Sequence, residues 1–224
     1  MIFDPACGSG NLLLNNKVSN PKQIYGIDLD PVAIMCCKIN YYLKFGHNAP
    51  SPNIFCKNFM NFIIENPSIH FDLLLCNPPF GASLSIGDFL SARTVETEDS
   101  LTFFVEHGAK MASDSIFILP ESVANVKKHQ PLRKFLLENV NVTNICTHGS
   151  GFSGTMFPII SMHIKSLGNC SDIRFDNASV SKKQLRSLPY MYFRPISADT
   201  ERVLNKIYSK SIQSLKGSDF AQVS

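Results

Sequence analysis

The sequence lacks several features that would place it in a specialised class of protein. No apolar run reaches the length needed to cross a bilayer, and residues 1–10 lack the charged and then apolar layout of a secretory signal. None of the seven cysteines forms a C-x-x-C pair, the usual spacing of structural zinc sites. An odd number of cysteines fits reduced thiols better than disulfides. We therefore expect a cytoplasmic protein with no membrane contact, no metal and no disulfide framework.

A strong excess of charge is also missing. The formal net charge of +3 neither requires nor excludes nucleic acid, because a local basic face matters more than the total. The 44% hydrophobic and 17% charged residues are those of an ordinary globular protein. At 224 residues, the chain can form one α/β domain with an appendage. Composition alone indicates no function.

The most informative stretch is Asn77-Pro78-Pro79-Phe80, which follows the short apolar run Leu73–Cys76. An apolar run without alternation is typical of a strand buried on both faces of a parallel sheet. The two prolines end the ladder because neither has an N–H to donate, and they hold the preceding residue extended. The sequence therefore predicts a rigid platform at the carboxyl end of a strand, where ligands of open α/β sheets bind.

The groups on this platform suit a neutral exocyclic amine. The Asn77 side-chain oxygen and the Pro78 carbonyl can each accept one hydrogen from an –NH2 group, which frees the nitrogen lone pair to attack. The Phe80 ring offers a flat face for a base, and such stacking contributes about 1–3 kcal/mol. The alternative interpretation is a strand end followed by an ordinary Asn-Pro turn.

A glycine loop lies near the start of the chain. Asp4-Pro5-Ala6-Cys7-Gly8-Ser9-Gly10 follows the apolar pair Ile2-Phe3 and precedes a helix-like stretch, a pattern of strand, tight turn and helix. Glycines allow a ligand to approach the backbone, and the helix N-terminus favours a negative group such as a carboxylate. Few residues precede Asp4, so we expect the sequence to begin inside its first strand.

Two acidic residues follow in the next predicted unit, and they have different expected roles. Asp28 ends the predicted strand Ile24–Asp28, about 20 residues after the glycine loop, the usual offset of an acid that takes the ribose hydroxyls of an adenosine-bearing cofactor. Asp30 precedes Pro31, which predicts a helix N-cap with proline at the first helical position.

Strands and helices alternate along much of the chain, which predicts a doubly wound, mostly parallel seven-stranded sheet with an antiparallel strand. Further strands are expected within Ile54–Phe59, Ser115–Pro120, Val142–Thr147 and Ile159–Lys165, and helices over Val32–Leu43, Ser100–Met111, Leu132–Asn139 and Asp199–Leu215. Gly81–Asp99 is expected to be a long loop. We assign residues 1–167 to this domain and residues 168–224 to a basic tail or a linker to a target-recognition region.

Together, the Asp4–Gly10 loop and the Asn77–Phe80 platform resemble the adenine-N6 DNA methyltransferases of restriction–modification systems, especially type I modification subunits and type IIG enzymes. The resemblance extends from about Ile2 to Lys165 and implies a Rossmann-like class I methyltransferase fold that binds S-adenosylmethionine. It further implies methyl transfer to the N6 amine of an adenine flipped out of double-stranded DNA. Specificity and restriction subunits are the implied partners.

The resemblance also implies a role for each motif residue. The residues that would hold the target adenine are those of the platform: Asn77, Pro78, Pro79 and Phe80. The residues that would hold the methionine part of the cofactor are those of the loop: Asp4, Pro5, Ala6, Cys7, Gly8 and Gly10. The adenosine part would contact Asp28, Leu29, Asn58 and Phe59. Catalysis would rest on positioning and electrostatic stabilisation, with no metal and no covalent intermediate.

Some alternatives stay open at this level. Asn58 stands where the relatives usually carry Asp, which predicts weaker cofactor binding, and a strand-ending Asn beside a core Phe59 explains both residues equally well. The same fold could methylate an RNA guanine amine or a protein glutamine, since similar platforms serve those acceptors. A truncated, non-catalytic remnant is the third alternative.

Overall fold

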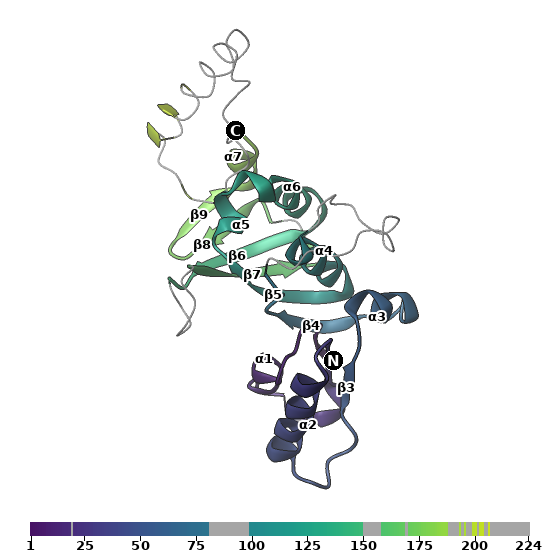
Figure 1. Ribbon diagram of the computed structural model, residues 1–224. Helices are drawn as coiled ribbons and strands as arrows, with labels where there is room; N and C mark the ends of the chain where they lie inside the picture. Colours follow the sequence, from purple (N-terminus) through teal and green to yellow (C-terminus); the bar gives the residue numbers. More distant parts are fainter. Residues whose placement is uncertain are drawn as a thin grey trace, which may run out of the picture.

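The computed structural model describes residues 1–18, 20–80, 99–149, 158–168 and 170–187, and residues 193, 195, 199–200, 202–203 and 206 (Figure 1). The strands described form one sheet in the order β3-β2-β1-β4-β5-β7-β6-β8-β9. The parallel part comprises β1 (Ile2–Asp4), β2 (Ile24–Asp28), β3 (Asn53–Cys56), β4 (Phe71–Cys76) and β5 (Ala112–Pro120). Strand β7 (Ile159–Lys165) runs antiparallel between β5 and β6 (Asn141–Thr147). The doubly wound α/β class is confirmed.

The sheet is wider than the seven strands predicted. Strands β8 (Asp172–Phe175) and β9 (Ala178–Ser181) continue it beyond β6, and α7 (Lys182–Ser187) follows them. Each of these strands has four residues with few buried apolar side chains, so no apolar run marks them in the sequence. The domain boundary at residue 167 stays a prediction. The predicted loop Gly81–Asp99 and helix Asp199–Leu215 lie largely outside the described residues.

Helices cover both faces of the sheet. One face carries α1 (Asn11–Leu14) and α2 (Pro31–Phe45), whose buried residues form one apolar cluster with β1, β2 and β3. The other carries α3 (Phe59–Glu65), α4 (Ser100–Met111), α5 (Ser122–Asn125) and α6 (Gln130–Asn139). Two short 3-10 helices, η1 (Pro21–Gln23) and η4 (Lys127–His129), precede β2 and α6. The described helices include none with the length and apolar character to span a bilayer.

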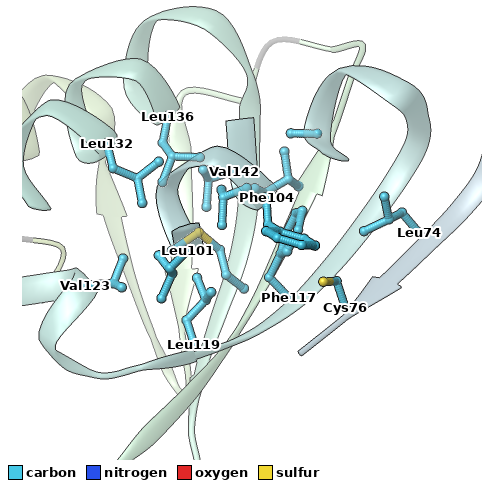
Figure 2. Close-up of a cluster of buried hydrophobic side chains, with 14 of the residues drawn as sticks. Leu74, Cys76, Leu101, Phe104, Phe117, Leu119, Val123, Leu132, Leu136 and Val142 are labelled. Atoms are coloured by element: carbon cyan, nitrogen blue, oxygen red, sulfur yellow. The ribbon is translucent and has the colours of Figure 1, made fainter. Parts of the chain in front are cut away.

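Strand β4 shows why its sequence does not alternate. Leu74 and Cys76 pack in the cluster beneath α4, where Figure 2 shows them near Phe104 and Phe117. Leu75 belongs to the opposite cluster, with α1 and α2. Because both faces of the strand are covered, apolar residues are needed at successive positions. The prediction of a strand buried on both faces is confirmed.

Side-chain caps set the starts of two long helices. Asp30 Oδ1 accepts the Val32 N–H at 2.8 Å, with Pro31 at the first helical position, as predicted. Asp99 Oδ1 accepts the Leu101 N–H at 3.2 Å and caps α4. The predicted bounds of α4 are confirmed, and its start at Ser100 places that residue beside the end of β4.

Candidate functional site

The carboxyl ends of β1, β2 and β4 lie side by side, because these strands are parallel neighbours. Two clefts open at this edge. The first has a volume of about 570 Å³ and is lined by residues of the glycine loop and α1, including Asp4 and Gly8. The second has a volume of about 430 Å³ and is lined by residues that follow β2, β3 and β4. Both clefts are bordered by Ala6 and Asn77, so they meet at the end of β4.

The glycine loop is tied to the next strand by Asp28. One carboxylate oxygen of Asp28 accepts the Gly8 N–H at 2.8 Å, and the other accepts the Asp30 N–H at 3.0 Å. Gly10 has a φ of 85°, and a Cβ atom there would lie 2.6 Å from Cys37 Sγ. The loop therefore needs glycine at this position for both its backbone conformation and its packing. The sequence predicted Asp28 as a ligand residue but gave no sign of its bond to Gly8.

Asp4 is the buried acid of the first cleft. Its side chain is 1% exposed, and its Oδ1 atom accepts the Ala6 N–H at 3.0 Å. Burial raises the pKa of Asp4 to about 7, the Ala6 hydrogen bond opposes this rise, and the nearby charge of Asp28 adds to it. Its carboxyl group therefore titrates near neutral pH, at the wall of the cleft.

The other loop residues differ in how far they face the clefts. Ala6 borders both clefts, and Pro5 borders the second. Cys7 lines the first cleft, but its side chain is buried. Its hydrogen bond with Cys37 and its burial hold the pKa of the Cys7 thiol well above its usual range. Cys7 is therefore a neutral thiol that packs beneath the loop.

The platform at the end of β4 presents Asn77 to solvent. Asn77 is exposed and borders both clefts, whereas Pro78 is buried. Pro79 lines the second cleft, and Phe80 is 46% exposed. The Asn77 amide is thus not turned into the core, and it lies where the glycine-loop cleft and the β2–β3 cleft join.

Helix α4 holds this platform from behind. The Ser100 hydroxyl donates to the Pro79 carbonyl at 2.9 Å, and Ser100 is 1% exposed. Its neighbour Asp99 caps the helix and forms an ion pair with Lys128 at 3.1 Å. The sequence indicated no site role for Ser100 or Asp99, although an Asp-Ser pair before an apolar helix is a recognisable cap signal.

The second cleft brings together the remaining predicted cofactor residues. It is lined by Asp28, Leu29, Asn58 and Phe59, and Leu29 is 67% exposed. The Asn58 Oδ1 atom caps α3 by accepting the Met60 N–H at 2.8 Å. The Phe59 ring is 4% exposed and stacks on Phe104 with 4.9 Å between ring centroids. Asn58 and Phe59 therefore have structural roles as cap and core, and each also borders the cleft.

The composition of these walls fits an adenosine-bearing cofactor. In the second cleft, the Asp28 carboxylate could take hydroxyl groups while Leu29 and Phe59 give apolar contact to a ring. The first cleft offers the Asp4 carboxyl group and the glycine backbone to a polar chain. One extended ligand could occupy both clefts, since they share Ala6 and Asn77.

Relatives of known function include methyltransferases. Ribosomal protein L11 methyltransferase of Prochlorococcus marinus (strain AS9601) is 34% identical over 76 residues, which cover 34% of this chain and 25% of that protein. The tRNA1(Val) (adenine(37)-N6)-methyltransferase of Shewanella halifaxensis (strain HAW-EB4) is 29% identical over 102 residues, which cover 46% of this chain and 41% of that protein. The chain thus spans less than half the length of these relatives.

Solved structures share the fold. The methyltransferase subunit of a type I restriction-modification system from Streptococcus thermophilus has a TM-score of 0.66 at 18% identity, covering 92% of this chain and 52% of that one. The type IIG restriction endonuclease BpuSI has a TM-score of 0.64 at 19% identity, and the match covers 77% of this chain and 23% of that one. A putative class I S-adenosylmethionine-dependent methyltransferase from Listeria monocytogenes has a TM-score of 0.60 at 16% identity. That match covers 78% of this chain and 57% of the other. At these identities, the likeness concerns the fold.

These comparisons confirm the predicted class I methyltransferase fold, and the Listeria neighbour is named for its dependence on S-adenosylmethionine, the predicted cofactor. A known family, described as Eco57I restriction-modification methylase, matches residues 22–152, more than half of the chain. The matched segment contains Asp28, Asn58 and the platform Asn77–Phe80, while the glycine loop precedes it. With the two motifs placed around one pair of joined clefts, the chain belongs to the Eco57I restriction-modification methylase family.

Proposed function

We propose that this chain transfers a methyl group from S-adenosylmethionine to the exocyclic N6 amine of adenine in double-stranded DNA, within a restriction–modification system. The position of Asn77 carries this proposal. Its side chain is exposed at the junction of the two clefts that fit the cofactor. An amine bound by the Asn77 oxygen would therefore lie next to the cofactor.

The chemistry follows from the acceptors on the platform. S-adenosylmethionine supplies an electrophilic methyl group when it is bound. The Asn77 Oδ1 atom and the Pro78 carbonyl each accept one hydrogen of the target amine, so its lone pair points to the methyl carbon. With the cofactor bound, the N–C bond would form as the C–S bond breaks and leaves a neutral thioether, and the methylated amine would release one proton to solvent. Asn77 and Pro78 stabilise the positive charge that develops on the nitrogen.

Rigidity of the platform supports this role. Two prolines restrict the backbone, and the buried Ser100 hydroxyl holds the Pro79 carbonyl at 2.9 Å. A positioned acceptor pair needs no reorganisation during the reaction, which is the main source of rate in such a site. Phe80 is 46% exposed and is proposed to stack on an adenine flipped out of the duplex.

The predicted cofactor contacts remain part of the proposal. The methionine part is assigned to the glycine loop: Asp4, Pro5, Ala6, Cys7, Gly8 and Gly10. Of these residues, Asp4, Ala6, Cys7 and Gly8 line the first cleft, Pro5 lines the second, and Gly10 is in the lining of neither. In the second, Asp28 is assigned to the ribose, Leu29 and Phe59 to the adenine faces, and Asn58 to the adenine rim. Since Asn58 Oδ1 already caps α3, its amide N–H groups are the more available contact.

A second candidate changes the acceptor and keeps the chemistry. Two relatives are named for methylating a tRNA adenine and a ribosomal protein, at 29% and 34% identity over part of the chain. DNA is favoured because the matching family is one of restriction-modification methylases. Specificity and restriction subunits are proposed partners, and the cytoplasm is the proposed location, in keeping with seven free cysteines.

Two measurements test the proposal. Calorimetric titration with S-adenosylmethionine should show binding that Asp28→Ala weakens at least tenfold, since that change removes both the ribose ligand and the Gly8 acceptor. Label from methyl-tritiated cofactor should then enter N6-methyladenine in duplex DNA. Label in RNA or protein but not in DNA would favour the second candidate, and no cofactor binding at millimolar concentration would support a non-catalytic remnant.

A further inference from the structure

A separate cavity lies at the opposite edge of the sheet. Strands β6 and β8 run parallel to β5, so Asn141 and Asp172 begin at the amino edge, and α7 starts there after β9. The cavity has a volume of about 380 Å³ between the end of α6, the start of β6 and α7. Figure 1 shows α7 and α6 far from α1 and α2, beside which the glycine loop lies.

Lys182 is the unusual residue of this cavity. Its side chain is 8% exposed, yet within the described ranges its Nζ atom makes one hydrogen bond, to Asn141 Oδ1 at 3.1 Å. That oxygen also accepts the Cys170 N–H at 3.1 Å. An ammonium group carries three donors, and burying it is unfavourable unless a charge of opposite sign is near. Desolvation accordingly lowers the pKa of Lys182.

Two more cationic side chains line the same cavity. Lys183 is exposed, and Arg186 donates from NH2 to the Leu137 carbonyl at 2.8 Å, which leaves other guanidinium N–H groups. In the described part of the chain, no carboxylate forms an ion pair with Lys182, Lys183 or Arg186. Glu138 is the one acidic residue among the described residues of the lining, which therefore carry an excess of positive charge.

We propose that this cavity is a binding site for a phosphate-monoester group, held by Lys182, Lys183 and Arg186. Three cationic side chains line one cavity, and their combined charge suits a dianion better than it suits a singly charged carboxylate. A guanidinium fork also suits phosphate oxygens. The bound oxyanion supplies a negative charge next to the buried Lys182 ammonium. The volume of the cavity leaves room for a small group attached to the phosphate. The site does not depend on the proposed methyl transfer, since it uses no residue of the two clefts.

The test is a titration of the full chain with inorganic phosphate. Binding is measured by calorimetry and by the amide chemical shifts of residues around Asn141 and Lys182. Binding should be saturable, and acetate at equal concentration should not compete. Lys182→Met should weaken phosphate binding at least about tenfold, and Lys183→Met about threefold to fivefold, as expected for charge-assisted bonds. Lys134→Met is the matched control, an exposed lysine of α6 outside the cavity, and should leave binding unchanged.

Two outcomes would overturn the proposal. One is an absence of saturable binding at tens of millimolar phosphate in the wild-type chain. The other is an equal loss of binding in Lys182→Met, Lys183→Met and Lys134→Met, which would indicate general charge attraction. Lys183 is exposed, so its variant keeps the test valid if Lys182→Met does not fold.

Discussion

The two edges of the sheet differ in charge and in how they are built. At the carboxyl edge, the clefts contain the carboxyl groups of Asp4 and Asp28, and backbone turns shape them. At the amino edge, the cavity contains Lys182, Lys183 and Arg186, which come from one short helix. Parallel strands bring several loops to the carboxyl edge, so a site there can draw on residues distant in sequence. The two edges therefore suit ligands of different charge.

The residues at the carboxyl edge are also fixed by more side-chain hydrogen bonds than the Lys182 ammonium at the amino edge. Asp28 fixes the glycine loop, Asp99 caps α4, and Ser100 holds the platform. At the amino edge, the Asn141 amide is the one hydrogen-bond partner of the buried Lys182 ammonium among the residues that the structure describes. This contrast separates a preorganised site for chemistry from a site that a ligand would complete. The following predictions test it, from the largest expected effect to the smallest.

Asn77→Ala removes one of the two proposed acceptors for the target amine. Methyl transfer to DNA should fall about 1,000-fold or more, equivalent to about 4 kcal/mol, because this interaction forms with the developing charge. The dissociation constant of S-adenosylmethionine should change less than about threefold. Transfer is measured with labelled cofactor, with Asn177→Ala, an exposed residue between β8 and β9, as control. Retained transfer would refute the proposed role of Asn77.

Asp4→Asn tests the buried acid. The folded protein holds the Asp4 proton up to a pKa of about 7, whereas the unfolded chain releases it near 3.8, so wild-type stability falls as pH rises between these values. Asparagine keeps the acceptor for Ala6 and cannot ionise. Between pH 5 and pH 7, the variant should gain about 2–3 kcal/mol in free energy of unfolding relative to wild type. Urea unfolding checks this, with exposed Asp172→Asn as control; parallel pH curves would contradict it.

Gly10→Ala tests the packing of the glycine loop. The added Cβ atom would lie 2.6 Å from Cys37 Sγ and 2.8 Å from Leu14 Cδ1, at a φ of 85°. We expect a loss of about 2–3 kcal/mol in stability, from left-handed backbone strain and overpacking together. Gly8→Ala is the matched comparison, since its Cβ meets nothing within 4 Å and only the strain remains. In thermal or urea unfolding, Gly10→Ala should lose more stability than Gly8→Ala. Equal losses in the two variants would argue against overpacking.

Ser100→Ala removes the hydroxyl that holds the Pro79 carbonyl. One hydrogen bond is worth about 1 kcal/mol, so kcat for methyl transfer should fall about fivefold to tenfold, with little change in cofactor affinity. Ser115→Ala is the control, because Ser115 is equally buried and bonds the Gly108 carbonyl at 3.5 Å, away from the platform. A similar drop in both variants would indicate a general loss of stability instead.

Of these substitutions, Lys183→Met should have the smallest effect on the affinity for S-adenosylmethionine at the carboxyl edge. The lysine lies at the amino edge, so the affinity for S-adenosylmethionine should stay within about twofold of wild type, since distant sites act independently. Calorimetry with the cofactor measures this. A larger change would show that the two edges are energetically coupled.

Strong local signals in the sequence predicted much of the fold. The apolar run Leu73–Cys76, the Asp30-Pro31 cap and the helix Ser100–Met111 were all predicted and are present. The strands β8 and β9 were not predicted, because each has only four residues, too few for a local pattern to stand out. Their pairing stabilises them, β8 with β6 and β9 with β8. The same limit applies to Asn58, which the sequence leaves as either ligand or strand end and the structure uses as a helix cap.

By itself, the sequence determined which residue types stand at the ends of the strands: the glycine loop, Asp28 and the Asn77–Phe80 platform. These are local choices, since glycine, proline and capping residues restrict the backbone wherever they occur. Only the tertiary structure decided how they combine. It placed Asn77 at the junction of two clefts, Ser100 behind Pro79, and Lys182 in a basic cavity at the opposite edge. Such contacts depend on strand order and helix packing, which join residues far apart in the chain.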